Sequence, residues 1–172
     1  PDDLPPGIRY ELTVLRAKAY LELGQYPQAL STVREARALN PASASAVVME
    51  SRIALQAGRP AEAATLAEQA TTLAPNDSDA WGMRAAVAYA TAQLPVALSH
   101  YDRALQLAPD NSEALLGRSS VLMDLGRMAE AKQSLLTLSK VDVNEPRSAY
   151  LRAVIAESEG DREASRKLLG EV

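Results

Sequence analysis

A repeat of 34 residues constrains the fold of this chain more than any other feature. Small residues recur at that interval and form one column: Gly24, Gly58, Ala92, Gly126 and Gly160. A second column of small residues stands five positions later: Ala29, Ala63, Ala97, Ala131 and Ser165. Prolines keep the same interval at Pro41, Pro75 and Pro109, with Val143 at the fourth place. Columns that share one register without an insertion indicate a repeated supersecondary unit.

Each unit carries the signals of two helices joined by a short turn. Apolar residues recur at helical spacing before the glycine column, as at Thr13, Ala17 and Tyr20. Glycine accepts the left-handed conformation at a helix C-terminus, so this column predicts the end of the first helix. Prolines suited to the first turn of the second helix follow at Pro27, Pro60 and Pro95. We expect the second helix to end at Leu39, Leu73, Leu107 and about Lys140. New first helices then begin after N-caps at Ser43, Asp77 and Asn111, and at Pro146.

The pattern predicts an all-α fold, a right-handed α-solenoid of antiparallel helix pairs. The units span residues 10–43, 44–77, 78–111 and 112–145, and a fifth runs from 146 to 172. Stacked neighbours bury the apolar face that one pair leaves open. We expect residues 1–9, with three prolines, to be a linker. Because the chain starts at Pro1 and no polar capping helix follows the fifth unit, we expect it to be a fragment of a longer protein.

The columns resemble those of the tetratricopeptide repeat (TPR) family over about residues 10–169. The first unit matches the family pattern at Ala17, Tyr20, Gly24, Gln25, Tyr26, Ala29, Ala36 and Pro41. The third unit matches it at Trp81, Ala85, Ala97, Tyr101, Ala104 and Pro109. The resemblance implies a TPR superhelix. It also implies a scaffold that binds partner proteins, although a fold of this kind serves many pathways.

One face of each first helix is expected to line the concave groove of the superhelix, opposite the face that packs on the second helix. The candidate partner-binding residues on this face are Val14, Val48, Arg52, Leu55, Gly82, Ala86, Tyr89, Leu116, Met123 and Tyr150. The set is largely apolar, which predicts a groove for an amphipathic helix or an extended segment. The alternative is that other parts of the parent protein, or tight superhelical curvature, cover this strip. A family subtype clamps a C-terminal carboxylate with Lys, Asn and Arg, but the Asn residues are absent here.

A column of arginines departs from the family pattern, which has leucine at this place. It comprises Arg16, Arg84, Arg118 and Arg152, with Glu50 in the second unit. One interpretation is a ladder of donors for an acidic polymer or phosphate. The favoured interpretation is structural, with each arginine stem buried between helices and its head on a carboxylate or a helix C-terminus.

Several classes of function are excluded or disfavoured by the composition. The net charge of −4 argues against a nucleic-acid partner. There is no cysteine and a single histidine, His100, so we expect no metal site and no cofactor. We find no phosphate-binding loop, nucleophile elbow or zinc-helix motif, and therefore expect no catalysis. No apolar run has the roughly 20 residues of a membrane span.

The leading hypothesis is a non-catalytic scaffold that binds a protein or peptide segment. Two alternatives stay open: a regulatory or substrate-presenting arm of a larger enzyme, of glycosyltransferase or sulfotransferase type, and self-assembly through the ends of the array. The 14 arginines against 4 lysines and the 32 alanines are typical of a GC-rich bacterial source. The run from Tyr150 to Gly160 resembles TPR proteins of bacterial exopolysaccharide export and assembly. That resemblance implies the envelope or periplasm, ahead of the cytoplasm.

Overall fold

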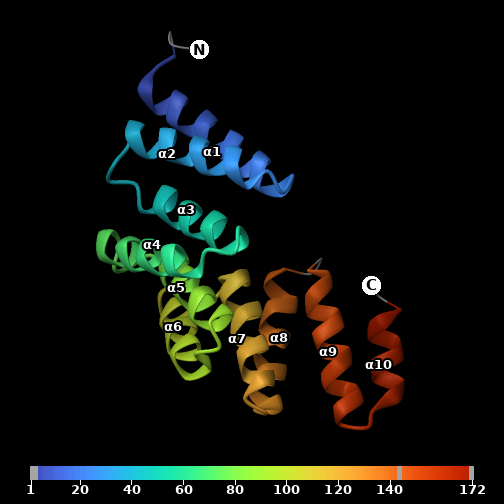
Figure 1. Ribbon diagram of the computed structural model, residues 1–172. Coiled ribbons are helices and arrows are strands. Elements are labelled where there is room, and N and C mark those ends of the chain that lie inside the picture. The colour runs from blue at the N-terminus through green and yellow to red at the C-terminus, as the bar shows by residue number, and fades with distance from the viewer. Residues whose placement is uncertain (1–3, 143–144, 171–172) are drawn as a thin grey trace.

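The computed structural model describes residues 4–142 and 145–170. Within these ranges the chain forms ten α-helices, five first helices alternating with five second helices (Figure 1). Pro1, Val143 and Val172, used above for the linker, the proline column and the last unit, lie outside the described residues. The helices are α1 (Pro6–Glu22), α2 (Tyr26–Leu39), α3 (Ala44–Gln56), α4 (Pro60–Leu73), α5 (Ser78–Ala90), α6 (Leu94–Leu107), α7 (Ser112–Asp124), α8 (Met128–Val141), α9 (Pro146–Ser158) and α10 (Arg162–Leu169).

The predicted turns and caps are confirmed. The four glycines of the first column have φ between 68 and 82°. At each turn the next backbone N–H donates to a carbonyl five residues earlier, as Gln25 does to Tyr20 at 2.9 Å. This bond closes the helix end in the Schellman geometry. Ser43, Asp77 and Asn111 are N-caps whose side chains accept backbone N–H groups of α3, α5 and α7.

The predicted linker is wrong for residues 6–9, because α1 begins at Pro6. The physical reason is the first-turn preference of proline, which lacks the amide hydrogen that this position leaves unpaired in any helix. Pro5 caps the helix in an extended conformation. Proline content alone therefore gave the wrong prediction at this end of the first unit.

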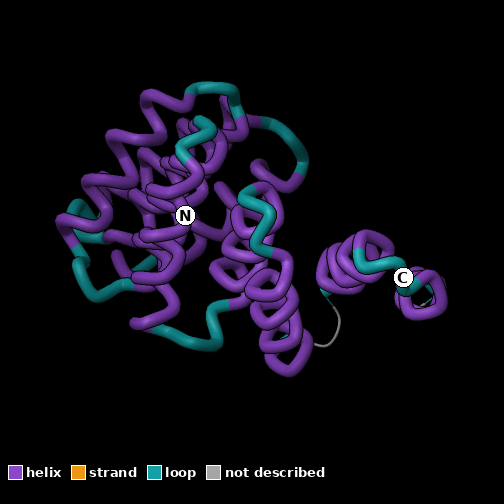
Figure 2. The backbone as a smooth tube through the Cα atoms, turned by 90° about the horizontal axis from the view of Figure 1, so that it is seen from below, coloured by secondary structure: helices purple, strands orange, loops and turns teal. Residues whose placement is uncertain are grey.

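The helices pack as antiparallel pairs, and the pairs stack into a curved array (Figures 1 and 2). Each first helix contacts the first helix of the next pair, whereas the second helices in the described ranges make no such contacts with one another. The first helices α1, α3, α5, α7 and α9 therefore form the inner surface of the curve, and the second helices form the outer one.

The core is built mainly from alanine and leucine. The alanines of the second column, Ala29, Ala63, Ala97 and Ala131, are fully buried. Their small side chains let the two helices of a pair approach closely. Larger side chains fill the spaces between pairs, including Ile53, Leu122 and Ile155. Ile155 of α9 belongs to the same apolar cluster as α5–α8, which joins the last pair to the array.

Candidate functional site

Two hollows open on the inner surface. The larger, here called the vestibule, has a volume of about 630 Å³ and lies between α1, α3 and the N-terminal ends of α5 and α7. The smaller, here called the Tyr101 pocket, has a volume of about 170 Å³ and lies between α3, α5 and α7. The vestibule is lined by Lys18, Leu21, Glu22, Ser45, Val48, Met49, Arg52, Asp77, Asp79, Asn111, Ser112 and Glu113. The Tyr101 pocket is lined by Arg52, Leu55, Gln56, Gly82, Met83, Ala86, Tyr101 and Glu113.

An ion pair between Arg52 and Glu113 belongs to both hollows. Its two hydrogen bonds, Nη1 to Oε1 at 2.8 Å and Nη2 to Oε2 at 2.5 Å, join α3 to α7. The bond from Arg52 holds the pKa of Glu113 below its ordinary value, and the same bond raises the pKa of Arg52. The Glu113 side chain is 66% exposed, so the pair contributes at most about 1 kcal/mol to stability. The pair crosses α5 near Gly82, where a Cβ atom would have no neighbour within 4 Å.

Four of the ten residues predicted to bind a partner come together in one place. Arg52, Leu55, Gly82 and Ala86 all line the Tyr101 pocket. The first two belong to α3 and the other two to α5. The small side chains of α5 leave the space between larger neighbours that the sequence pattern predicts.

Two predicted groove residues are buried instead. Val48 is 7% exposed and Leu116 is 8% exposed, and each belongs to an apolar core cluster. The reason is that each first helix contacts the first helix of the next pair. The neighbouring pair therefore covers the side chains of Val48 and Leu116. Val48 still reaches the wall of the vestibule with its remaining surface.

The other predicted groove residues lie outside both hollows. Tyr89 and Met123 are half-buried and pack on the core cluster of α5–α8. The Tyr89 hydroxyl donates to Asp124 Oδ2 at 2.8 Å, and burial together with this bond raises the pKa of Tyr89 to about 12. Val14 is half-buried, and Tyr150 is 55% exposed.

The groove is more charged than the apolar pattern predicts. Its N-terminal half carries the side chains of Lys18, Glu22, Asp77, Asp79, Arg52 and Glu113. Asp79 accepts a hydrogen bond from Asn111 Nδ2 at 2.8 Å. Sequence reasoning missed Glu113 as a groove residue because it considered three positions of each first helix. Glu113 lies three residues before Leu116, and residues at that spacing share a helix face.

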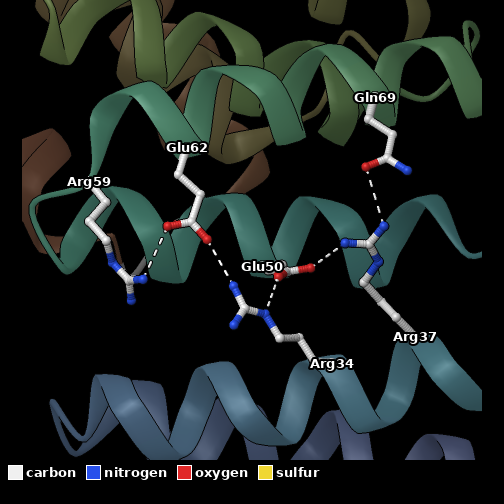
Figure 3. A network of polar contacts seen from close by, with 6 residues as sticks. All are labelled: Arg34, Arg37, Glu50, Arg59, Glu62 and Gln69. Atoms are coloured by element: carbon white, nitrogen blue, oxygen red, sulfur yellow. Dashed lines mark hydrogen bonds and ion pairs between the residues drawn. The ribbon is translucent and has the colours of Figure 1, made fainter.

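Arg84, Arg118 and Glu50 form ion pairs that join successive helix pairs, whereas Arg16 pairs inside its own unit and Arg152 forms no ion pair with the described residues. Arg118 Nε donates to Asp102 Oδ1 at 2.7 Å, and Arg84 lies 3.7 Å from Glu68. The second unit reverses the charges, since Glu50 on α3 accepts from Arg34 Nε at 2.7 Å and also pairs with Arg37 (Figure 3). In the ion pairs Arg34–Glu50 and Arg118–Asp102, the two partners are 16 residues apart in sequence. Arg16 pairs with Glu35 of α2. These contacts support the structural interpretation over a ladder for an acidic polymer.

His100 lies on the outer side of the array. Its ring is 5.5 Å from that of Trp81, and burial together with the charge of Arg84 lowers the pKa of His100. Trp81 anchors α5 by donating from Nε1 to the Pro75 carbonyl at 2.9 Å. Across the described ranges, no group of three or more His, Asp or Glu side chains is placed to hold a metal ion. No helix in those ranges has the length and apolar character needed to cross a lipid bilayer.

Comparison with known proteins identifies the repeat as a tetratricopeptide repeat. Two tetratricopeptide repeat models match the sequence, one over residues 14–78 and 48–112 and the other over residues 88–155. No curated protein matches the chain. Among solved structures, a thermophilic TPR protein of Thermus thermophilus has a TM-score of 0.84 at 19% identity, with 94% of this chain and 89% of that chain covered.

Two further similar structures are of TPR proteins described as peptide-binding or peptide-bound. YrrB, a TPR protein with an unusual peptide-binding site, has a TM-score of 0.63 at 20% identity, covering 92% of this chain and 81% of its own. The first TPR of Spaghetti, bound to the HSP90 peptide SRMEEVD, has a TM-score of 0.60 at 20% identity, covering 69% of this chain and 94% of its own. At these identities the likeness shows the fold.

Proposed function

The chain belongs to the tetratricopeptide repeat family, and from that premise we propose that it is a non-catalytic scaffold that binds an extended segment of a partner protein along its inner groove. The observation that carries the proposal is the pair of neighbouring hollows, of about 630 and 170 Å³, on the concave surface. Ligand-binding sites typically have volumes of about 300–1,000 Å³ and a few convergent polar groups, and the vestibule falls in this range.

The ion pair between Arg52 and Glu113 favours an extended segment over a helix. A helix with its side chains is about 10–12 Å in diameter and needs an open trough. Here the ion pair joins α3 to α7 across the groove and separates the two hollows. An extended chain sends alternate side chains to opposite sides, so it can pass the ion pair and place one side chain in each hollow.

The peptide-binding sites of YrrB and of the first TPR of Spaghetti support this proposal by analogy of fold. The contacts proposed for this chain are Arg52, Leu55, Gly82 and Ala86, which share the Tyr101 pocket. Tyr89 and Met123 would contact the segment where it leaves the pocket toward α7. Val48 contributes the wall of the vestibule.

The experiment is selection of a phage-displayed random dodecapeptide library on the whole chain, followed by calorimetric titration of a selected peptide. Gly82→Leu adds a side chain to the lining of the Tyr101 pocket, at a position where a Cβ atom would meet nothing within 4 Å. We expect it to weaken binding about thirtyfold, the cost of losing one buried anchor of about 2 kcal/mol. Ala64→Leu, which adds the same side chain to the exposed face of α4, is the matched control. Equal affinity of Gly82→Leu and the native chain would place the binding site elsewhere.

The cellular setting that we propose is the bacterial envelope, within an exopolysaccharide export or assembly system. Support comes from the excess of arginine over lysine, the alanine content and the resemblance of the run from Tyr150 to Gly160. The alternative is the arm of a larger enzyme. The full reading frame tests it, because a catalytic domain in the same chain would replace the scaffold proposal. Fractionation of cells that express the tagged protein tests the compartment, and recovery in the cytosol would contradict the envelope.

A second candidate function, self-assembly, is favoured by the face of α1 that has no preceding helix pair to cover it in the described residues. Ile8, Leu12 and Leu15 are 48%, 50% and 62% exposed. In the following units the equivalents of Leu12 are alanines buried against the preceding pair, as Ala46 and Ala80 are. An apolar face of this kind suits a helix pair of a second copy. Light scattering over a concentration series tests this, and Leu15→Glu is expected to abolish any association that it detects.

A further inference from the structure

The Tyr101 pocket has the chemistry to select the side chain that enters it, an inference that rests on the proposed function. Tyr101 is 5% exposed and lines the pocket. Within the described part of the chain its hydroxyl makes no hydrogen bond, and the group is not sealed in the core. Burial raises the pKa of Tyr101 to about 12, so the phenol is neutral and can both donate and accept.

The pocket exists because two positions differ together from their equivalents in the other units of this chain, although Tyr101 itself matches the family pattern. Gly117 stands where the other units have a large apolar residue, namely Leu15, Met49, Met83 and Leu151. Tyr101 stands where they have Val33, Ala67, Leu135 and Leu169. A Cβ atom on Gly117 would lie 2.2 Å from Tyr101 Cζ and 2.3 Å from the hydroxyl oxygen. The missing side chain on α7 therefore lets a tyrosine of the outer helix α6 bring its hydroxyl to the inner surface.

The charge around the pocket is acidic. The vestibule that opens beside it holds four carboxylates and two cationic groups: Glu22, Asp77, Asp79 and Glu113 against Lys18 and Arg52. Arg52 is already paired with both oxygens of Glu113. An incoming anion would meet this surplus of carboxylates, whereas a cation would be attracted by it.

The remaining walls are apolar except for the amide side chain of Gln56. Leu55, Met83 and Ala86 face the space between the ion pair and the tyrosine hydroxyl. A purely apolar side chain would fit these walls but would leave the hydroxyl buried without a partner, which is costly. A side chain with an aliphatic stem and a hydrogen-bonding head satisfies both parts of the pocket.

We propose that the Tyr101 pocket takes a lysine or arginine side chain of the bound segment. The aliphatic stem packs against Leu55 and Met83, and the cationic head donates to Tyr101 Oη and to the Glu113 carboxylate. Glu113 keeps its bonds to Arg52, because a carboxylate has about four acceptor sites. The scaffold is therefore selective for basic segments.

The test uses a peptide obtained from the dodecapeptide selection described above, labelled with fluorescein and titrated by fluorescence anisotropy. Tyr101→Phe removes the hydroxyl and keeps the ring, and we expect it to weaken binding about tenfold. Its melting temperature should not fall, because the hydroxyl makes no hydrogen bond to any residue that the structure describes. Glu113→Gln should weaken binding to a similar extent, and Glu163→Gln, an exposed acid on α10, is the matched control. Replacing the basic residue of the peptide by norleucine should abolish the effect of Tyr101→Phe.

The outcomes separate this inference from the general function. Selected peptides that share a lysine or arginine, and that lose affinity in Tyr101→Phe, support it. Selected peptides without a basic residue, or with unchanged affinity for Tyr101→Phe, overturn the pocket assignment and leave peptide binding intact. Binding of the acidic peptide SRMEEVD as tightly as a selected basic peptide also overturns it. A selection that enriches no peptide overturns the proposed function and the pocket assignment together.

Discussion

Ala92 holds a backbone conformation that its side chain opposes, so we expect Ala92→Gly to stabilise the protein. Its φ is 58°, whereas the glycines at the equivalent turns have φ between 68 and 82°. The turn is otherwise the same, since Gln93 N–H donates to the Ala88 carbonyl at 2.9 Å and Arg59 N–H to the Ala54 carbonyl at 2.9 Å. A Cβ atom in this left-handed region costs about 1–2 kcal/mol.

The expected magnitude follows from two opposing effects. Removing the Cβ atom removes about 1–2 kcal/mol of backbone strain from the folded state. Glycine also raises the conformational entropy of the unfolded chain, which lowers stability by about 0.4–1 kcal/mol. The net gain in the free energy of unfolding is therefore about 0.5–1 kcal/mol. For a chain of this size it corresponds to a rise of about 1–4 °C in Tm.

The assay is urea and thermal denaturation followed by far-UV circular dichroism, with the native chain and two variants side by side. Gly58→Ala makes the reverse change at an equivalent turn, where a Cβ atom would meet nothing within 4 Å. It should lose about 1 kcal/mol, and because no contact changes, the loss reports the backbone alone. A urea midpoint for Ala92→Gly at or below that of the native chain, with an unchanged m-value, would refute the reasoning.

Three further predictions concern packing and charge. Gly117→Ala should lower stability by about 1–3 kcal/mol because its Cβ atom would overlap the Tyr101 ring, and adding Tyr101→Leu should restore most of the loss in denaturant titrations. Glu50→Ala should cost about 2–3 kcal/mol, since this 4% exposed side chain pairs with two arginines; a loss below about 0.5 kcal/mol in the same titration would contradict it. The pKa of Glu113, followed by NMR, should lie below its ordinary value and return to it in Arg52→Met. Because the folded pKa is depressed, the contribution of this pair to stability is present above the ordinary glutamate pKa and is lost as the pH falls through the folded pKa.

Much of the fold could be predicted from the sequence because its signals act within one turn or one helix. Glycine ended four of the first helices, proline stood in the first turn of α2, α4 and α6, and Ser43, Asp77 and Asn111 capped α3, α5 and α7. The buried alanine column set the close approach within each pair. Residues 6–9 were misjudged because proline is read as a linker signal and a helix start alike.

The candidate site was predictable only in part. Helical periodicity placed Arg52, Leu55, Gly82 and Ala86 on one face, and they share a pocket. It did not show that Val48 and Leu116 are covered, because their exposure depends on the distance between first helices of neighbouring pairs.

The sequence by itself determined the helices, their pairing and, apart from the start of α1, their ends, through steric and hydrogen-bonding preferences that span a few residues. Only the tertiary structure decided that Arg52 meets Glu113 across 61 residues and that Tyr101 passes Gly117 to reach the inner surface. Those contacts depend on the curvature of the stack. The curvature is a sum over the packing of every pair, so no local pattern encodes it.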